Sequence, residues 1–452
     1  MERNLTTGSV LRNILLFSLP YLLSYFLQTL YGMADLFIIG QFEGVASTTA
    51  VSVGSQVMHM ITVMLVGLAM GSTVTIAQAV GGEKRQRAAD AVGSTATIFL
   101  ALSVVLTLVL LRFVYPIVSV MSTPAEAVAG TAQYLTICFL GIPCITAYNI
   151  ISAIFRGMGD SKSPMYFIAI ACAANIGLDF LFMGALRLGP AGAALGTTIS
   201  QGISVVIALI VALIVICRKG TGLPVTKACF RPKRTVTGQI LRIGIPVALQ
   251  DGLIQVGFLV ITVIANGRGL TDAAAVGIVE KIISFLFLVP SSMLSTVSAL
   301  GAQNIGAGKP ERAKSTLRYA VIITAGFGLI MAVLMQFIAA QVVSLFTPDQ
   351  AVWVAGGQYL RGYILDCALA GVHFSFSGYF CARGRSEFSF LHNIISLCLA
   401  RLPGAYLTSL WFPASLFPMG LATAAGSLVS VLICLIAYRI ITRKDPKVPA
   451  VA

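Results

Sequence analysis

Apolar stretches long enough to cross a lipid bilayer follow one another along almost the whole chain. A helix needs about 20 apolar residues to span the hydrocarbon layer, and a backbone in that layer must satisfy its own hydrogen bonds. The 452 residues are 57% hydrophobic and only 10% charged, with a mean hydropathy of +0.92. We therefore predict an all-α integral membrane protein with twelve transmembrane helices. The predicted spans are residues 14–39, 50–78, 92–116, 130–154, 165–185, 192–216, 240–265, 275–302, 318–344, 355–381, 388–411 and 419–440.

The second half of the sequence repeats features of the first half at a constant offset of 225 residues. The matching positions are Gln78 and Gly81 with Gln303 and Gly306, Arg87-Ala88 with Arg312-Ala313, Ser119 with Ser344, Gln133-Tyr134-Leu135 with Gln358-Tyr359-Leu360, Phe155 with Phe380, and Gly159 with Gly384. Because six spans return the chain to the side on which it began, the two halves have the same orientation. We predict two pseudo-symmetric lobes of six helices around a midplane cavity, an arrangement typical of secondary transporters.

The formal net charge of +14 is concentrated in alternate loops between the predicted spans. Such a bias places basic loops in the cytoplasm, so we expect both termini to be cytoplasmic and the protein to lie in the cell inner (plasma) membrane. The longest basic segment separates the lobes, which predicts an N-lobe at 1–216, a cytoplasmic linker at 217–239 and a C-lobe at 240–452. No small-residue cleavage site follows Arg3 and Arg12, so we expect the first span to be retained. This charge pattern predicts a lipid bilayer partner and no nucleic acid.

A set of oxygen-bearing side chains falls within the predicted spans of the N-lobe. Gln28, Tyr31 and Asp35 lie on one stripe of the first helix, whereas Asn175 and Asp179 are neighbours one turn apart on the fifth. Thr197 lies on the sixth. Ionisable side chains inside spans are functional candidates because their insertion is costly. Two carboxylates, an amide and a hydroxyl suit a hard cation or a shared proton, or else form a buried hydrogen-bond network that fixes helix packing.

Other candidates are scattered over the remaining spans. Asp251 and Asp366 are expected to face a cavity, and Met33 is expected to help line it. His373 could titrate near neutral pH, although a histidine among apolar neighbours is more often packed. The roles of Glu280, Lys281 and Arg401 stay open. Pro20 and Pro246 each lie in the first helix of a lobe, where the missing N–H favours a kink and a conformational hinge.

Several classes of function have no residues to support them. The closest approach to a phosphate-binding loop, Gly306 to Pro310, lacks the first glycine and the final serine or threonine of that motif. No protease or esterase motif is present, and the nine cysteines form no CxxC pair. We therefore expect neither an enzyme nor a resident cofactor.

The ordered motifs together resemble the multidrug and toxic compound extrusion (MATE) transporters of the MOP flippase superfamily. They are Pro20 to Gly40 with Gln28, Tyr31 and Asp35, then Gly71, Gln78 to Gly81, Arg156-Gly157-Met158-Gly159-Asp160, and Gln303 to Gly308 followed by Arg312-Ala313. The resemblance implies a V-shaped, monomeric bundle that exports amphipathic or cationic organic compounds in exchange for inward Na⁺ or H⁺.

By position, the resemblance also assigns residues. Asp35, Asn175, Asp179 and Thr197 match the family's N-lobe cation network, and Gln28 and Tyr31 match cavity residues beside it. The family's C-lobe site needs an acid where this chain has Ile254 and another near Val372 and His373. This departure shifts the expected ion site to the N-lobe. The alternatives are a flippase for a lipid-linked or amphipathic metabolite, which also uses duplicated bundles, and a membrane-embedded enzyme or receptor.

Overall fold

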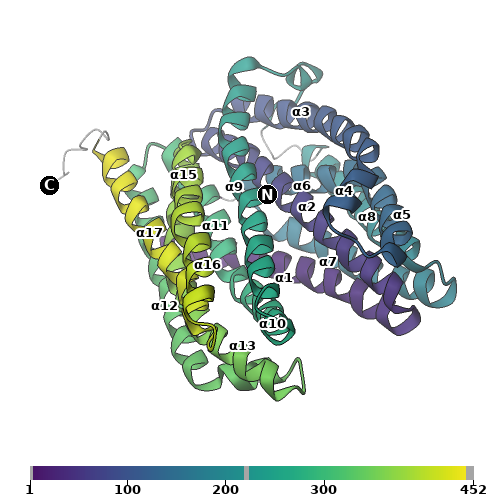
Figure 1. Ribbon diagram of the computed structural model, residues 1–452. Helices are drawn as coiled ribbons and strands as arrows, with labels where there is room; N and C mark the ends of the chain where they lie inside the picture. The colour runs from purple at the N-terminus through teal and green to yellow at the C-terminus, as the bar shows by residue number, and fades with distance from the viewer. Residues whose placement is uncertain (1–3, 218–222, 444–452) are drawn as a thin grey trace. The chain divides into compact units, whose positions relative to one another are not determined.

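The protein is almost entirely helical in the computed structural model, which describes residues 4–217 and 223–443. No β-strand occurs among these residues. In this described part of the chain, eleven helices are long and apolar enough to cross a membrane, and one bent pair of helices brings the number to twelve. The predicted all-α membrane protein with twelve spans is thereby confirmed, and Figure 1 shows the order of its helices along the chain.

The chain forms two compact units, of which the first comprises Met1–Gly252 and Ser298–Ala313 and the second comprises Leu253–Val297 and Lys314–Ala452. The helices up to the predicted linker are α1 (Val10–Phe42), α2 (Val45–Gly81), α3 (Arg85–Arg112), α4 (Val114–Val120), α5 (Ala125–Leu140), α6 (Ile142–Gly157), α7 (Lys162–Asp179), the π-helix η1 (Phe180–Ala185) and α8 (Gly189–Cys217). A short 3-10 helix, η2 (Lys227–Phe230), follows.

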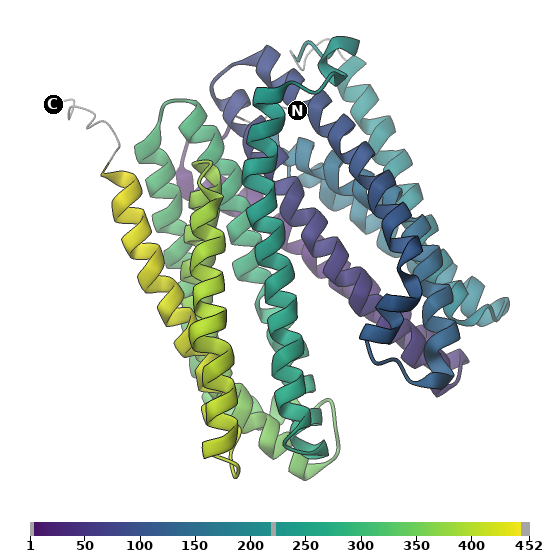
Figure 2. The same ribbon diagram turned by 45° about the horizontal axis from the view of Figure 1, so that its top comes forward.

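The remaining helices are α9 (Arg234–Asn266), α10 (Leu270–Leu286), α11 (Leu288–Gly306), α12 (Pro310–Ser344), α13 (Gln350–Tyr363), α14 (Leu365–Ala382), α15 (Ser386–Ser396), the π-helix η3 (Leu397–Arg401), α16 (Leu402–Trp411) and α17 (Phe417–Thr442). Within the second unit α17 packs against α13, α14, α15 and α16. Figure 2 shows α16 and α17, at the yellow end of the chain, running side by side.

The fourth predicted span is bent rather than straight. It consists of α5 and α6, which meet at Gly141 with an angle of 48° between them. Pro143 lies in the first turn of α6, where its missing N–H breaks no hydrogen bond within that helix. The bend therefore follows from a proline that starts a new helix after Gly141.

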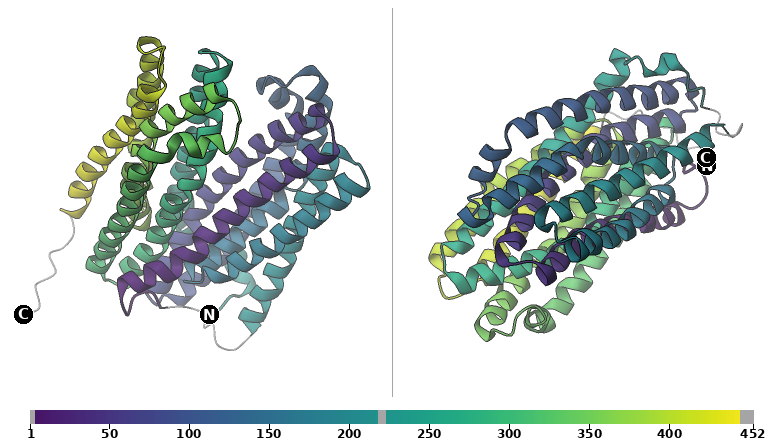
Figure 3. Two further views of the ribbon diagram at one scale, coloured as in Figure 1. Left: turned by 90° about the horizontal axis from the view of Figure 1, so that it is seen from below. Right: turned by 90° about the vertical axis from the view of Figure 1, so that its right-hand side faces the viewer.

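The two prolines predicted as hinges lie inside uninterrupted helices. α1 continues through Pro20 and α9 through Pro246, and Figure 3 shows α1 as one long helix. The Ser24 hydroxyl donates a hydrogen bond of 2.8 Å to the Pro20 carbonyl. Neither observation tests movement, so the hinge roles of Pro20 and Pro246 stay predictions.

The backbone keeps the register of the sequence repeat. Gly159 and Gly384, which are 225 residues apart, have φ values of +91° and +70°. Glu83 and Gly308 have the same separation and φ values of +55° and +71°. Two loops of each half therefore turn through the left-handed region, in which glycine is the favoured residue. The repeat extends from residue identity to chain conformation.

Close backbone contacts explain why the first unit includes residues from the second half of the sequence. A Cβ atom at Gly81 would collide with the Gln303 carbonyl, and one at Gly306 would collide with the Gln78 carbonyl. Gln78 and Gln303, like Gly81 and Gly306, are repeat partners, so the contact between α2 and α11 is reciprocal. Glycine at both positions lets the two backbones touch.

The start of α9 packs on α2 in a similar way. A Cβ atom at Gly71 would collide with the Ile240 carbonyl, and the Gln239 amide donates a hydrogen bond of 2.7 Å to Gln78. The compact units therefore differ from the lobes predicted at 1–216 and 240–452, whose boundaries stay predictions about the repeat. Residues 218–222 of the predicted linker and 444–452 at the C-terminus lie outside the described residues, as do residues 1–3.

Candidate functional site

Asp35 lies on α1, on the side that faces α8. The residue is only 3% exposed, in a helix that is otherwise largely apolar. The Thr197 hydroxyl donates a hydrogen bond of 3.0 Å to Asp35 Oδ2, while Asp35 Oδ1 has no hydrogen-bond partner. The structure therefore joins two of the four residues predicted to form the cation network.

Asn175 and Asp179 complete the same cluster from α7. Both are buried, and the Asp179 carboxylate and the Asn175 amide adjoin Asp35. Neither carboxylate oxygen of Asp179, and neither polar atom of the Asn175 amide, has a hydrogen-bond partner. We name Asp35, Asn175, Asp179 and Thr197 the oxygen cluster. All four come from helices that pack together, since α1 contacts α7 and α7 contacts α8.

A glycine makes room for the Asp179 carboxylate. A Cβ atom at Gly196 on α8 would collide with Asp179 Oδ1. Asp179 is also the last residue of α7 before the π-helix η1, a type of distortion frequently found at functional sites. Sequence spacing gave no indication that Gly196 contacts a carboxylate.

The charge of the oxygen cluster is unusual for a buried site. Within the described residues no lysine, arginine or histidine forms an ion pair with Asp35 or Asp179. Two adjoining carboxylates in an apolar bundle are stable only when protons or cations reduce their charge. Carboxylate, amide and hydroxyl oxygens are ligands that hard cations prefer, so the unpartnered oxygens fit Na⁺ as well as H⁺.

The polar stripe of α1 continues beside the cluster. Tyr31 adjoins Asp35 and Gln201, and Gln28 adjoins Tyr148. Met33 is 47% exposed, and its position on α1 is about 200° away from Asp35 around the helix axis. The structure thus brings Gln28 and Tyr31 to the side of the cluster but does not bring Met33 there. Gln201 and Tyr148 are neighbours that sequence reasoning missed.

The other predicted cavity residues lie elsewhere. Asp251, near the boundary of the first unit, rests on α2, where a Cβ atom at Gly67 would lie 2.7 Å from its Oδ2. Asp366 and His373 are buried in the second unit. The cavity roles of Asp251, Asp366 and His373 stay predictions.

Asp366 and His373 belong to a buried polar network of the second unit. Arg401 donates a hydrogen bond of 2.8 Å to Asp366 Oδ2, and the Ser427 hydroxyl lies 3.3 Å from both the Arg401 guanidinium and His373 Nε2. The rings of His373 and His392 are 5.4 Å apart. His392 was missed from the sequence because a neutral histidine in an amphipathic helix carries no distinctive pattern.

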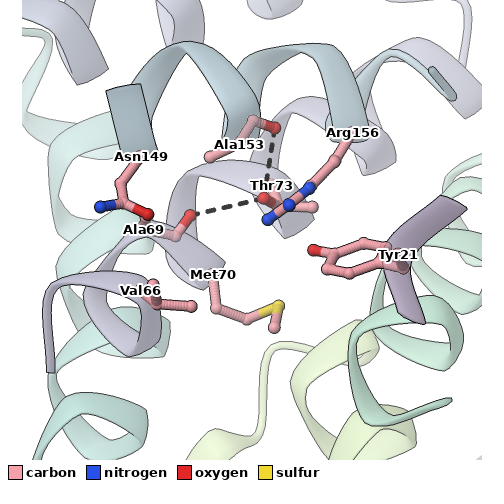
Figure 4. A pocket seen from close by; sticks show the side chains of 8 residues that line it. All are labelled: Tyr21, Val66, Ala69, Met70, Thr73, Asn149, Ala153 and Arg156. Carbon is pink, nitrogen blue, oxygen red and sulfur yellow. Dashed lines mark hydrogen bonds between the residues drawn. The ribbon is translucent and has the colours of Figure 1, made fainter. Parts of the chain in front are cut away.

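A small pocket in the first unit is lined by residues other than the oxygen cluster (Figure 4). Its wall includes Tyr21, Thr73, Asn149 and Arg156. The Arg156 guanidinium lies 3.9 Å from the centre of the Tyr21 ring, a cation–π contact that helps to hold a positive charge in an apolar setting. Arg156 is only 7% exposed, so the arginine of the Arg156-to-Asp160 motif is buried against the Tyr21 ring.

A bundle of membrane-spanning helices with an acidic cluster buried inside it is typical of an integral membrane transporter. The sequence profile of the MatE family matches residues 20–181 and 246–407, and this chain belongs to that family. The two matches begin at Pro20 and Pro246 and have equal length, which confirms the duplication predicted from the sequence.

Named relatives agree with this assignment. The chain is 28% identical over 413 residues to the probable multidrug resistance protein YpnP of Bacillus subtilis, covering 90% of each chain. It is 26% identical over 383 residues to the multidrug export protein MepA of Staphylococcus aureus, covering 84% of this chain and 83% of MepA.

Solved structures share the fold. A multidrug resistance MATE family transporter of the MOP superfamily, in an outward-facing conformation, has a TM-score of 0.90 and 23% identity, with 98% of each chain covered. A crystal structure of MATE in the straight conformation has a TM-score of 0.89 and 24% identity, covering 97% of this chain and 98% of the other.

Proposed function

We propose that this protein is a multidrug efflux antiporter, which exports amphipathic or cationic organic compounds in exchange for inward Na⁺ or H⁺. The oxygen cluster carries the proposal. Asp35 and Asp179 are two buried carboxylates that lack a basic partner and have three unpartnered oxygens between them. The family assignment and the names of YpnP and MepA support both the class of substrate, drugs, and the direction of transport, out of the cell.

The mechanism rests on charge compensation within the oxygen cluster. A cation or proton that enters the cluster neutralises a carboxylate and draws Asp35, Asn175 and Asp179 around it. Because α1 carries both Asp35 and the neighbouring Gln28 and Tyr31, a change at the carboxylate is transmitted to the polar stripe of the same helix. Alternating occupation by ion and by drug then gives exchange.

The available driving force is sufficient for export. One elementary charge that moves through 100 mV supplies about 2.3 kcal/mol. A tenfold concentration ratio requires about 1.4 kcal/mol. A single coupled charge therefore sustains more than a tenfold gradient of a neutral compound.

The deciding experiment uses the purified full chain in liposomes, with sodium and pH gradients imposed separately. We expect gradient-driven movement of the fluorescent cation ethidium by the wild type. Asp35→Asn should abolish this movement without preventing membrane insertion, because the amide cannot carry the charge that the ion compensates. Asp349→Asn is the matched control, since Asp349 is an exposed N-cap of α13 and asparagine caps equally well.

The same liposomes distinguish a flippase. Movement of a fluorescent phospholipid between leaflets without any ion gradient, together with no gradient-driven ethidium movement, would favour the flippase alternative. Unchanged ethidium export by Asp35→Asn at equal reconstitution would show that the oxygen cluster is not the coupling site.

A further inference from the structure

The second unit contains a carboxylate that is neutralised by the protein itself. Asp366 on α14 is fully buried, and Arg401 at the end of η3 donates a hydrogen bond of 2.8 Å to its Oδ2. The Arg401 side chain is 15% exposed. A second hydrogen bond of 3.3 Å joins Arg401 to the Ser427 hydroxyl on α17, so the guanidinium is held by two oxygens from two helices.

The groups around this pair are polar but do not compete for the arginine. Ser427 also contacts His373 Nε2, and His392 is hydrogen-bonded to Ser377 and Ser430 at 2.8 and 3.2 Å. Tyr359 and Tyr363 adjoin Arg401, and their hydroxyls and Asp366 Oδ1 are buried without hydrogen-bond partners. The surroundings of Arg401 therefore provide additional oxygens that could hold a small cation.

The internal repeat allows each residue of the oxygen cluster to be compared with its counterpart in the second half of the chain. The two family matches begin at Pro20 and Pro246 and end at residues 181 and 407, so they are 226 residues apart. At that offset the counterparts of Asp35, Asn175 and Asp179 are Ile261, Arg401 and Ala405, and only Thr197 keeps its hydroxyl, at Thr423. A positively charged side chain thus occupies the position at which the first half has the Asn175 amide.

We infer that Arg401 is a tethered cation, whose guanidinium occupies a monovalent-cation site formed by Asp366 and Ser427. While the arginine is present, this site exchanges no ion with solution, and ion exchange is confined to the oxygen cluster of the first unit. Removing the arginine side chain leaves a buried carboxylate with free oxygens, which binds Na⁺ or a small guanidinium ion. The inference extends the proposed ion coupling by assigning different roles to the two buried acidic sites.

The test measures thermal unfolding of the purified full chain in detergent with Asp179→Asn as the background, so that the oxygen cluster does not contribute. The probes are NaCl and methylguanidinium chloride at about 100 mM, each compared with choline chloride, because a ligand that binds only the folded state raises the unfolding temperature. We expect Arg401→Ala in this background to gain about 2 °C or more with at least one probe. The background variant alone should gain nothing.

Two further variants make the result specific. Adding Asp366→Asn to Arg401→Ala should abolish the gain, and Arg401→Lys, which keeps the charge, should show none. Absence of a gain with both probes, or a gain that survives Asp366→Asn, overturns the inference. A failure of the proposed ion coupling has a separate signature, since wild type and Asp179→Asn would then respond equally to cations.

Arg401→Ala leaves the buried Asp366 carboxylate unpaired, which can prevent folding. A second variant therefore tests the same inference without an unpaired buried charge. The paired substitution Asp366→Asn with Arg401→Gln removes both charges, and replacing a whole buried ion pair is tolerated better than breaking it. This pair should keep the same cation-dependent shift in unfolding temperature as the wild type. A smaller shift would mean that Asp366 binds an exchangeable ion, which also overturns the inference.

Discussion

Asp179→Asn separates the charge of the oxygen cluster from its hydrogen bonding. Neither Asp179 oxygen accepts a hydrogen bond, so the amide replaces the carboxylate without breaking one. At an effective dielectric constant of about 20, two unit charges about 4 Å apart interact by about 4 kcal/mol. Removing one carboxylate should therefore weaken cation binding by roughly a thousandfold. It should also stabilise the cation-free protein, because Asp35 loses an adjoining negative charge.

The assay is thermal unfolding of the purified full chain during separate titrations with Na⁺ and with protons. The wild type should gain stability with whichever cation it binds, and Asp179→Asn should unfold at a higher temperature without cation and respond little to either titration. Asp349→Asn again serves as the control for loss of one carboxylate at the surface. Equal responses of Asp179→Asn and wild type to both cations would refute the view that the two carboxylates act together.

Two glycine substitutions test the packing on which the site depends. Gly196→Ala should reduce ion-driven transport strongly, because its Cβ would displace the Asp179 carboxylate, whereas Gly177→Ala on α7, which has open space around it, should retain transport. Gly306→Ala should lower the free energy of unfolding by about 1–3 kcal/mol through overpacking against Gln78, and Gly326→Ala, also with open space, is its control. Equal behaviour of variant and control in transport or denaturant unfolding would contradict the corresponding contact.

Hydropathy and the repeat predicted the helices well, because a spanning segment must be apolar and helical whatever its neighbours are. Pro143 was not predicted as the break in the fourth span, since a proline predicts a bend only when its place within the helix is known. Helical spacing placed Asn175 beside Asp179 on one helix. Their approach to Asp35 depends on how α1 and α7 pack, which spacing does not reveal.

The partners of the buried acids also could not be predicted from the sequence. The sequence indicated Asp35 and Asp366 as buried acids but gave no means of distinguishing them. One adjoins another carboxylate, and the other is paired with Arg401, which lies 35 residues away along the chain. Pairing partners of this kind are set by tertiary packing, as is the contact of Gly196 with Asp179. The family resemblance identified the residues of the oxygen cluster, but it gave no partner for Arg401.

The contact of α2 with α11 and the start of α9 has a consequence for the origin of the duplicated chain. A polypeptide that ended at the predicted linker would lack the segment that covers Gly71 and Gly81. Because Gly81 and Gly306 are repeat partners, a single-repeat ancestor would have needed a second copy of itself packed against the same surface. Gene fusion would then have converted an obligate two-fold homodimer into one continuous protein.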